Sequence, residues 1–259
     1  MRSRPMNGAN VSTSPEAVLA PALRKLQLWE PFNDEDAAAL LALPYQLRTL
    51  RAHQYIVREQ EKPRECCVLL EGFAIRHKTT GNGDRQIFSI HMPGDLVDLH
   101  NSLLRSADHS IEVLSHATGA FIPIEAIKAI AYARPKVGQA MWYETLVDAS
   151  IFREWTLNVG RRDALTRTAH MLCEFAVRIE AAGLGQKLGF ELPMTQSELA
   201  DALGLTAIHL NRRLKVLREE KLLTYDKRTV EILDFQRLAQ VGDFDPRYLH
   251  LERTTLMPG

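Results

Sequence analysis

The sequence lacks the features of a membrane protein, a disulfide-rich secreted protein or a common hydrolase. It has no apolar run of about 18 residues or more, so no membrane span is predicted. Three cysteines are too few for a disulfide framework, and the cytoplasm is the expected compartment. A nucleophile elbow, a Walker loop, an HExxH motif and paired catalytic carboxylates are all missing, so we do not expect an enzyme.

The chain also lacks net charge. Its 32 Lys and Arg residues equal its 32 Asp and Glu residues, so the total charge gives no sign of a polyanionic partner. A length of 259 residues predicts one or two domains, and 46% hydrophobic with 25% charged residues is typical of globular proteins. Met1–Ala20 is rich in Ser, Pro, Asn and Ala without an apolar core, which favours a flexible arm over a secretion signal. Any nucleic-acid signal must therefore be local.

Such a local signal lies in residues 195–218, where a glycine joins two short amphipathic segments. Thr195 and Glu198 have the spacing of a capping box at the start of the first helix. Gly204 supplies a tight turn, and Thr206 can cap the second helix. Leucines spaced four and three apart mark the buried face of that second helix: Leu210, Leu214 and Leu217. The pattern predicts a helix-turn-helix.

The opposite face of the second helix carries the charge. Between Thr206 and Arg218 there are four basic side chains and no acidic one. This is typical of a recognition helix that enters the major groove of DNA. An ordinary helical hairpin with a solvated basic face is the alternative, but the coincidence of caps, glycine and leucines favours DNA binding. The predicted DNA-contacting residues are Thr206, Ala207, Ile208, His209, Asn211, Arg212, Arg213 and Lys215.

A β-hairpin is predicted directly after this helix. The β-prone runs Leu222–Tyr225 and Thr229–Leu233 flank a polar turn. A hairpin in this position is a wing. Lys227 and Arg228 at its tip are expected to contact phosphates and so to position the protein without reading sequence.

Short strands and one long helix precede the helix-turn-helix. From about residue 47 to 124 β-prone runs alternate with glycine-containing turns, among them Gly81–Asp84, which predicts an antiparallel barrel or sandwich. Residues 135–158 form a helical pattern with a single apolar stripe. Packing of that stripe on the chain's own barrel is possible, but pairing with a second copy suits a helix-turn-helix protein, since these bind half-sites in pairs. The stripe consists of Trp142, Leu146, Ala149 and Phe152.

Barrel, long helix, helix-turn-helix and wing, in this order, resemble the Crp/Fnr family, which includes the cyclic-AMP receptor protein and the fumarate-nitrate reduction regulator. The resemblance implies an α+β fold with an N-terminal antiparallel β-roll of the cyclic-nucleotide-binding jelly-roll type, a long dimerisation helix and a C-terminal winged helix-turn-helix. It implies a homodimer on a palindromic double-stranded operator, contact with RNA polymerase and a possible small-molecule effector. The expected divisions are an arm (1–21), a sensor domain (22–134), a dimerisation helix (135–158), a DNA-binding domain (159–240) and a tail (241–259).

The recognition helix departs from the family pattern at two positions. The resemblance assigns Thr206 to a phosphate-neighbouring cap and assigns Ala207, Ile208 and Arg212 to base-reading positions. Only Arg212 is of a usual base-reading type, able to engage guanine O6 and N7. Asn211 can pair with adenine. The operator is therefore expected to differ from that of the cyclic-AMP receptor protein.

The sensor domain departs further. Relatives that bind cyclic nucleotide carry Gly-Glu-Leu after a Gly-Asp turn and then Arg-Ser or Arg-Thr. Here Gly94-Asp95 is followed by Leu96–His100, and His109-Ser110 stands where the arginine belongs. The two strongest polar contacts to such a ligand are lost, so cyclic-AMP binding is not expected. Candidate effector-pocket residues are Asp98, His100, Arg105, His109 and Ser110.

Neither a metal nor a cofactor is expected. An iron-sulfur cluster of the kind found in the fumarate-nitrate relative needs about four closely spaced cysteines. Cys66 and Cys67 are neighbours in a strand, so one is interpreted as a buried filler and the other is left open as an exposed redox thiol. Histidines recur between residues 91 and 116, but their spacing matches no zinc template, and no carboxylate or thiol partner is evident. They are His91, His100, His109 and His116.

The leading hypothesis is thus a homodimeric, sequence-specific DNA-binding transcription regulator. A ligand-binding regulatory module that acts on a protein partner is the alternative, and it predicts a degenerate helix-turn-helix. The intact caps, glycine and leucines of residues 195–218 favour DNA binding.

Overall fold

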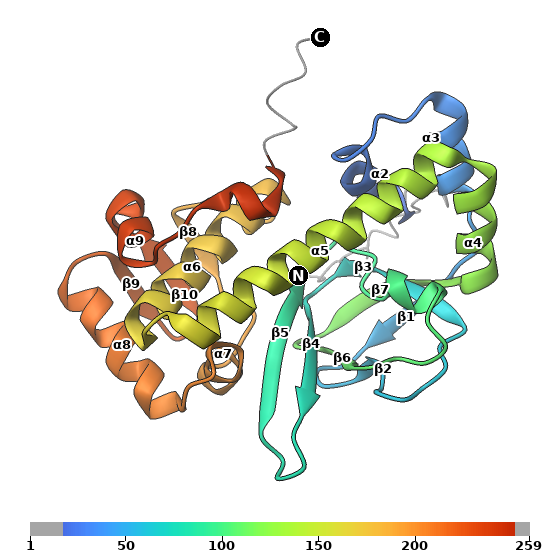
Figure 1. Cartoon of the computed structure of the whole chain (residues 1–259). Helices are drawn as coiled ribbons and strands as arrows, with labels where there is room; N and C mark the ends of the chain where they lie inside the picture. The colour runs from blue at the N-terminus through green and yellow to red at the C-terminus, as the bar shows by residue number, and fades with distance from the viewer. Residues whose placement is uncertain (1–17, 252–259) are drawn as a thin grey trace, which may run out of the picture.

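The computed structural model, which describes residues 18–251, contains an N-terminal β-roll, one long helix and a C-terminal helical module with a small sheet. The long helix, α5, runs across the molecule from the β-roll to the C-terminal module (Figure 1). This is the α+β arrangement predicted from the sequence, which is confirmed. None of the described helices is long and apolar enough to cross a membrane.

Two antiparallel sheets form the β-roll. One has the strand order β1-β7-β3, and the other has the order β2-β6-β4-β5. Buried Ile, Val and Leu side chains fill the space between the sheets and under the helices. The strands are β1 (Gln46–Leu50), β2 (Tyr55–Val57), β3 (Glu65–Glu71), β4 (Ala74–Thr79), β5 (Arg85–His91), β6 (Ser110–Val113) and β7 (Ala117–Pro123).

The β4–β5 hairpin is the part of the roll that reaches the C-terminal module. Thr79 pairs with Arg85 across the predicted glycine turn, where Gly83 has a φ of 95°. Arg85 forms an ion pair with Asp201 at 2.9 Å, and the Gln86 side chain donates to the Ala202 carbonyl at 3.2 Å. The sensor domain therefore contacts the first helix of the helix-turn-helix directly.

The N-terminal side of the roll is covered by α2 (Ala20–Gln27) and α3 (Asp34–Leu41). The predicted end of the flexible arm at residue 21 is wrong, because α2 already begins at Ala20. Leu19 and Leu26 are fully buried against the roll. The rest of the predicted arm, residues 1–17, lies outside the described residues. After the roll, α4 (Ile124–Ala133) leads to the long helix.

The long helix α5 (Pro135–Arg161) has 27 residues, so it is about 40 Å long. Pro135 occupies its first turn, where no backbone donor is needed. The predicted end at residue 158 is three residues too early. A new helix, α6 (Ala164–Ala181), starts once the Asp163 side chain accepts from the Leu165 and Thr166 amides.

The C-terminal module contains the predicted helix-turn-helix and wing. The wing sheet has three strands in the order β8-β10-β9, one more than predicted. Part of the expected tail also belongs to the fold, since Leu249 is buried and Phe244 packs against the core. Residues 252–259 of that tail lie outside the described residues. The elements are α7 (Gln196–Leu203), α8 (Ala207–Glu219), β8 (Gly189–Glu191), β9 (Leu223–Asp226), β10 (Thr229–Ile232), α9 (Phe235–Val241) and η2 (Pro246–Leu249).

Candidate nucleic-acid interface and sensor sites

The turn between α7 and α8 has the geometry that the sequence predicts. The Thr195 amide donates to the Glu198 carboxylate at 2.7 Å, and the Glu198 amide donates to Thr195 Oγ1 at 3.3 Å, which completes the capping box. Gly204 ends α7 in the left-handed region, with φ 60°. Thr206 then caps α8 by accepting from the His209 amide at 3.2 Å. These local contacts set the angle at which α8 leaves the turn.

The buried face of α8 fixes the helix to the module. Leu210, Leu214 and Leu217 are each at most 1% exposed and pack in one core with α6 and α7. Arg213, on the neighbouring row of α8, is half-buried. Because three leucines anchor the helix over two turns, its opposite face is held rigidly toward solvent.

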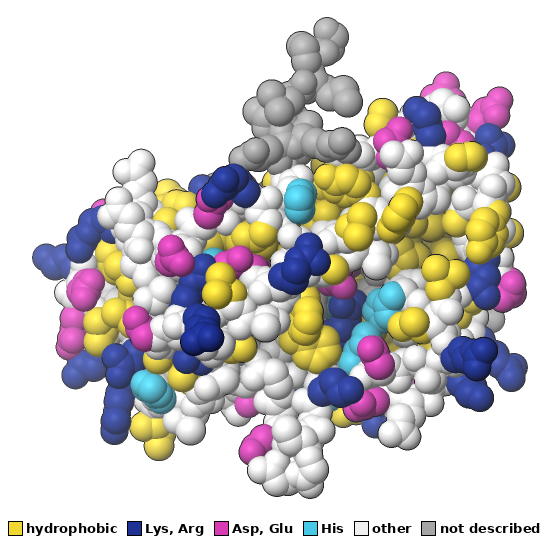
Figure 2. Space-filling view, viewed as in Figure 1, with side chains coloured by type: hydrophobic (Ala, Val, Ile, Leu, Met, Phe, Trp, Pro, Cys, Tyr) yellow, Lys and Arg dark blue, Asp and Glu magenta, His cyan; other side chains and the backbone are white. Residues whose placement is uncertain are grey.

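The opposite face of α8 is free to contact a ligand. Ile208 is 70% exposed, and Asn211, Arg212 and Lys215 are exposed as well. Lys and Arg side chains gather over this part of the surface, at the left of Figure 2. The side-chain amide of Asn211 donates to Gln196 Oε1 at 2.8 Å, which occupies one of its two N–H donors and orients the side chain.

The remaining predicted contact residues lie around this face. Thr206 is exposed at the start of α8, while Ala207 and His209 are half-buried beside it. In the wing, Lys227 is exposed with φ 55° at the turn between β9 and β10, and Arg228 is half-buried. The structure thus brings a basic helix face and a basic hairpin tip into one module, as a winged helix-turn-helix requires.

The apolar stripe on α5 is exposed. Trp142, Leu146 and Phe152 are 69%, 51% and 50% exposed, and Ala149 between them is half-buried. Hydrophobic side chains follow the outward face of α5 in Figure 2. The other face of the helix packs on the protein's own core through buried side chains such as Trp155. An exposed row of large apolar side chains of this kind is typical of an interface with another chain.

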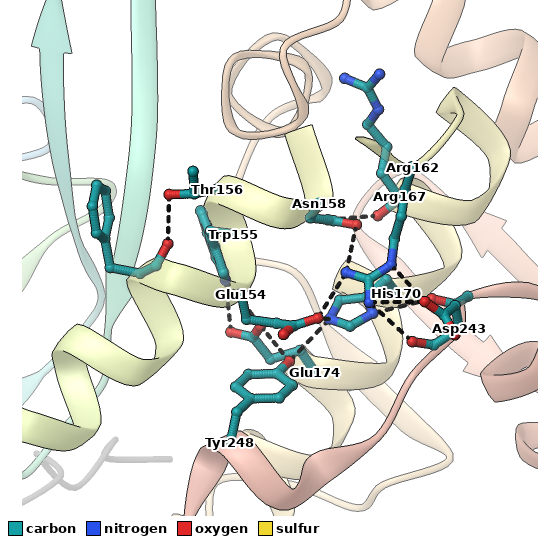
Figure 3. A network of polar contacts seen from close by, with 12 residues as sticks. Glu154, Trp155, Thr156, Asn158, Arg162, Arg167, His170, Glu174, Asp243 and Tyr248 are labelled. Atoms are coloured by element: carbon teal, nitrogen blue, oxygen red, sulfur yellow. Dashed lines mark hydrogen bonds and ion pairs between the residues drawn. The ribbon is translucent and has the colours of Figure 1, made fainter. Parts of the chain in front are cut away.

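A buried polar network joins α5 to α6 and to the segment after α9 (Figure 3). Its centre is Glu174, which is 2% exposed. One carboxylate oxygen accepts from Trp155 Nε1 at 2.9 Å and from the Tyr248 hydroxyl at 2.7 Å. The other accepts from Arg178 at 3.1 Å, and Arg178 also donates to the Ile90 carbonyl of β5 at 2.6 Å. The network therefore links the long helix, the DNA-binding module and the sensor sheet.

A second set of contacts continues this network toward the end of α5. Arg162 forms ion pairs with Glu154 at 2.7 Å and with Asp243 at 3.0 Å (Figure 3). His170 is 1% exposed, with Nδ1 3.0 Å from the Gly242 carbonyl oxygen. Burial lowers the pKa of His170 from its usual value. These side chains hold the segment after α9 against the junction of the two helices.

The predicted effector-pocket residues differ in burial and in their partners. The Asp98 carboxylate is buried and accepts from the Cys67 amide at 2.8 Å, and burial raises its pKa to about 7. Ser110 accepts from the Glu59 amide at 3.0 Å, and Arg105 is exposed. His100 and His109 do lie together, with ring centroids 4.9 Å apart. That all five residues line one effector pocket stays a prediction.

A cavity of about 380 Å³ lies between α2, α5, α6 and β5, and of the five predicted residues it is lined by His100 alone. Several charged groups on its wall are paired with one another. Lys25 bridges Asp95 and Glu144, and Arg76 binds Asp148 at 2.5 Å. The sequence does not reveal this site, because some of the segments that form its walls are more than 200 residues apart in the chain.

The cysteines give no support for a redox thiol. Cys66, Cys67 and Cys173 are all free and fully buried. Burial raises the pKa of each thiol, that of Cys173 to about 12. The alternative of an exposed reactive cysteine at 66 or 67 is wrong, because both side chains of this strand face apolar cores of the roll.

Two family models match this chain. A cyclic nucleotide-binding domain matches residues 47–132, which hold most of the β-roll. A Crp-like helix-turn-helix domain matches residues 166–241, which include α7, α8 and the wing strands β9 and β10. The order of the two domains is the order that the sequence predicts.

Curated relatives align along most of the chain. It is 27% identical over 216 residues to the transcriptional activator protein FnrL of Cereibacter sphaeroides, covering 82% of this chain and 86% of FnrL. It is 23% identical over 225 residues to the fumarate and nitrate reduction regulatory protein of Vibrio cholerae, with coverage of 83% and 87%. The structure of FixK2 from Bradyrhizobium japonicum superposes with a TM-score of 0.71 at 24% identity, covering 77% of this chain and 98% of FixK2, which establishes the shared fold.

Proposed function

Because this chain belongs to the Crp/Fnr family, we propose that it is a homodimeric transcription regulator that binds a two-fold symmetric DNA operator. The observation that carries the proposal is the outward face of α8. It is basic, exposed and fixed by two caps and three buried leucines. A rigid helix that presents Asn211 and Arg212 fits the major groove and can read base edges there. Lys215, Lys227 and Arg228 are proposed to contact phosphates.

The dimer is proposed to form through α5. The exposed stripe of Trp142, Leu146 and Phe152 supports this, because two parallel copies would bury it against itself. A two-fold dimer carries two copies of α8, and each would occupy one half-site. The contacts that link α5 to α6, centred on Glu174, would then transmit the geometry of the dimer to the spacing of the two α8 helices.

The remaining partners follow from this function. A regulator of transcription acts in the cytoplasm on DNA and, in this proposal, meets RNA polymerase there. A small-molecule effector is proposed to bind the cavity between α2, α5, α6 and β5, not the five residues predicted from the sequence. Closure or opening of this cavity would move α5 relative to the roll, because Glu144 and Asp148 of α5 form part of its wall.

Replacing Arg212 by alanine is expected to weaken operator binding by about 1–3 kcal/mol and to relax specificity at one position in each half-site. The side chain is exposed on α8, so the fold should not change. The measurement is binding of wild type and variant across a library of operator sequences. Arg218→Ala is the matched control, since Arg218 is an exposed arginine in the last turn of the same helix. Identical sequence profiles for wild type and Arg212→Ala would overturn the role of Arg212.

Replacing Lys227 by asparagine is expected to weaken binding about equally to all sequences and to reduce the salt slope of log K by about 1. Asparagine tolerates the positive φ of 55° at this turn, so the change removes charge without backbone strain. Lys221→Asn is the control, because Lys221 is also exposed and has φ 56°. An unchanged salt slope for Lys227→Asn would contradict a phosphate contact at the wing tip.

A further inference from the structure

Two imidazoles and a carboxylate lie together at the two ends of the segment that follows β5. His100 lies in the short helix η1 (Leu99–Ser102), and Asp108 and His109 directly precede β6. One potential ligand atom from each of the three side chains lies within 4.8 Å of the other two. His109 Nδ1 is 2.6 Å from Asp108 Oδ1. This trio was not evident in the sequence, because seven residues separate His100 from Asp108.

The ring nitrogens that point away from these contacts are buried and unsatisfied. His109 is 6% exposed, and within the described residues neither its Nε2 nor that of His100 has a hydrogen-bond partner. Buried polar atoms are almost always paired, so two such nitrogens on adjacent rings need an explanation. A cation bound between the rings would supply one.

We propose that His100, Asp108 and His109 bind a divalent transition-metal ion. Two imidazole nitrogens and one carboxylate oxygen are ligands that suit Zn²⁺ or Fe²⁺, whereas Mg²⁺ and Ca²⁺ prefer oxygen ligands alone.

The surroundings permit a cation at this place. The positive charge of Arg76 acts on both histidines. Its guanidinium is bound to the Asp148 carboxylate at 2.5 Å, so its charge is balanced by a partner on α5. The Asp108 carboxylate remains to offset part of the charge of the ion.

Binding requires a small closure of the segment. Ligand atoms about 2.0 Å from a tetrahedral Zn²⁺ are about 3.3 Å from one another, which is closer than the 4.8 Å limit of this cluster. The Asp108 side chain is 72% exposed, and residues 103–106 between the two histidines are exposed. Both can move without disturbing the core.

The position of the cluster gives metal binding a route to the dimer helix. The His109 ring packs edge-on against Phe88, with centroids 5.8 Å apart, and Phe88 packs against Phe152 of α5 at 5.6 Å. Phe152 belongs to the exposed stripe of α5. A metal that fixes the His109 ring would therefore also restrict Phe88 and change its packing against Phe152. The effect of this change on the dimer rests on the proposed function.

The test uses the full chain, without an affinity tag and treated with a chelator. Zn²⁺ is titrated in competition with a chromophoric chelator, and Co²⁺ absorption reports the ligand set. Wild type is expected to bind one ion per chain, and Asp108→Asn and His109→Gln to bind at least about 10–100-fold more weakly. His116→Gln is the control, because His116 is an exposed histidine of the same domain. Circular dichroism melts verify that the variants fold, and the exposed Asp108 provides a variant that leaves the core intact.

Binding of less than half an ion per chain by wild type would overturn the proposal, and so would equal affinities for wild type, Asp108→Asn and His109→Gln. The metal titration needs no DNA, so its outcome is independent of the proposed function. Operator affinity is measured separately with and without Zn²⁺. Equal operator affinities with and without bound Zn²⁺ would overturn only the route through Phe88 and Phe152.

Discussion

Replacing Leu146 by glutamate is expected to convert the dimer into a monomer and to lower operator affinity by about 10²–10⁴-fold, the gain that joining two binding modules provides. Leu146 is 51% exposed at the middle of the α5 stripe. In a two-fold interface the substitution places two carboxylates close together in apolar surroundings. Sedimentation equilibrium measures the mass of the particle, and fluorescence anisotropy measures its affinity for a full operator and for a half-site.

Leu47→Glu is the matched control for this prediction. Leu47 is 55% exposed on β1 of the sensor roll, away from α5. The same substitution there should leave mass and affinity unchanged. A Leu146→Glu protein that remains a dimer would contradict the role of the α5 stripe, and a monomer with undiminished affinity would contradict binding to two half-sites.

Replacing Glu174 by alanine is expected to lower the free energy of unfolding by about 3–5 kcal/mol, the usual cost of removing one partner from a buried ion pair. The substitution leaves the Arg178 guanidinium without its carboxylate. It also leaves the donors of Trp155 and Tyr248 without their acceptor. Urea denaturation of the full chain measures the loss.

Glu219→Ala serves as the control for Glu174→Ala. Glu219 is an exposed glutamate at the end of α8 whose only described ion pair is with Lys215 at 3.6 Å. Exposed pairs of this kind contribute about 0–1 kcal/mol, so the control should unfold almost as the wild type does. A loss below about 1 kcal/mol for Glu174→Ala would mean that the junction of α5 and α6 does not depend on this network.

Features with a local cause could be predicted from the sequence. The capping box of Thr195 and Glu198, the left-handed Gly204 and the buried leucines of α8 depend on residues within one or two turns of one another. Their spacing is therefore visible in the chain itself. The same holds for the glycine turn between β4 and β5.

Features with a distant cause could not be predicted. Strand β7 contains Gly119 in its interior, which is unusual for a strand. A Cβ there would lie 2.7 Å from Cys67 Sγ of the neighbouring strand. Phe244 and Tyr248 show no periodicity, and they pack because α5 and α6 meet beside them. The cavity and the His100–Asp108–His109 cluster are likewise products of packing between segments, so their residues carry no pattern along the chain.

The most direct test of a dimeric DNA-binding regulator is selection of DNA from a random pool by the purified full chain at a fixed salt concentration. A dimeric regulator is expected to enrich a two-fold symmetric motif whose half-sites are centred about 10 base pairs, or one helical turn, apart. Selection is repeated with cell extract and with Zn²⁺ to supply a missing effector. Failure to enrich a motif under any of these conditions, or enrichment of a single asymmetric half-site, would contradict binding of DNA by a two-fold dimer.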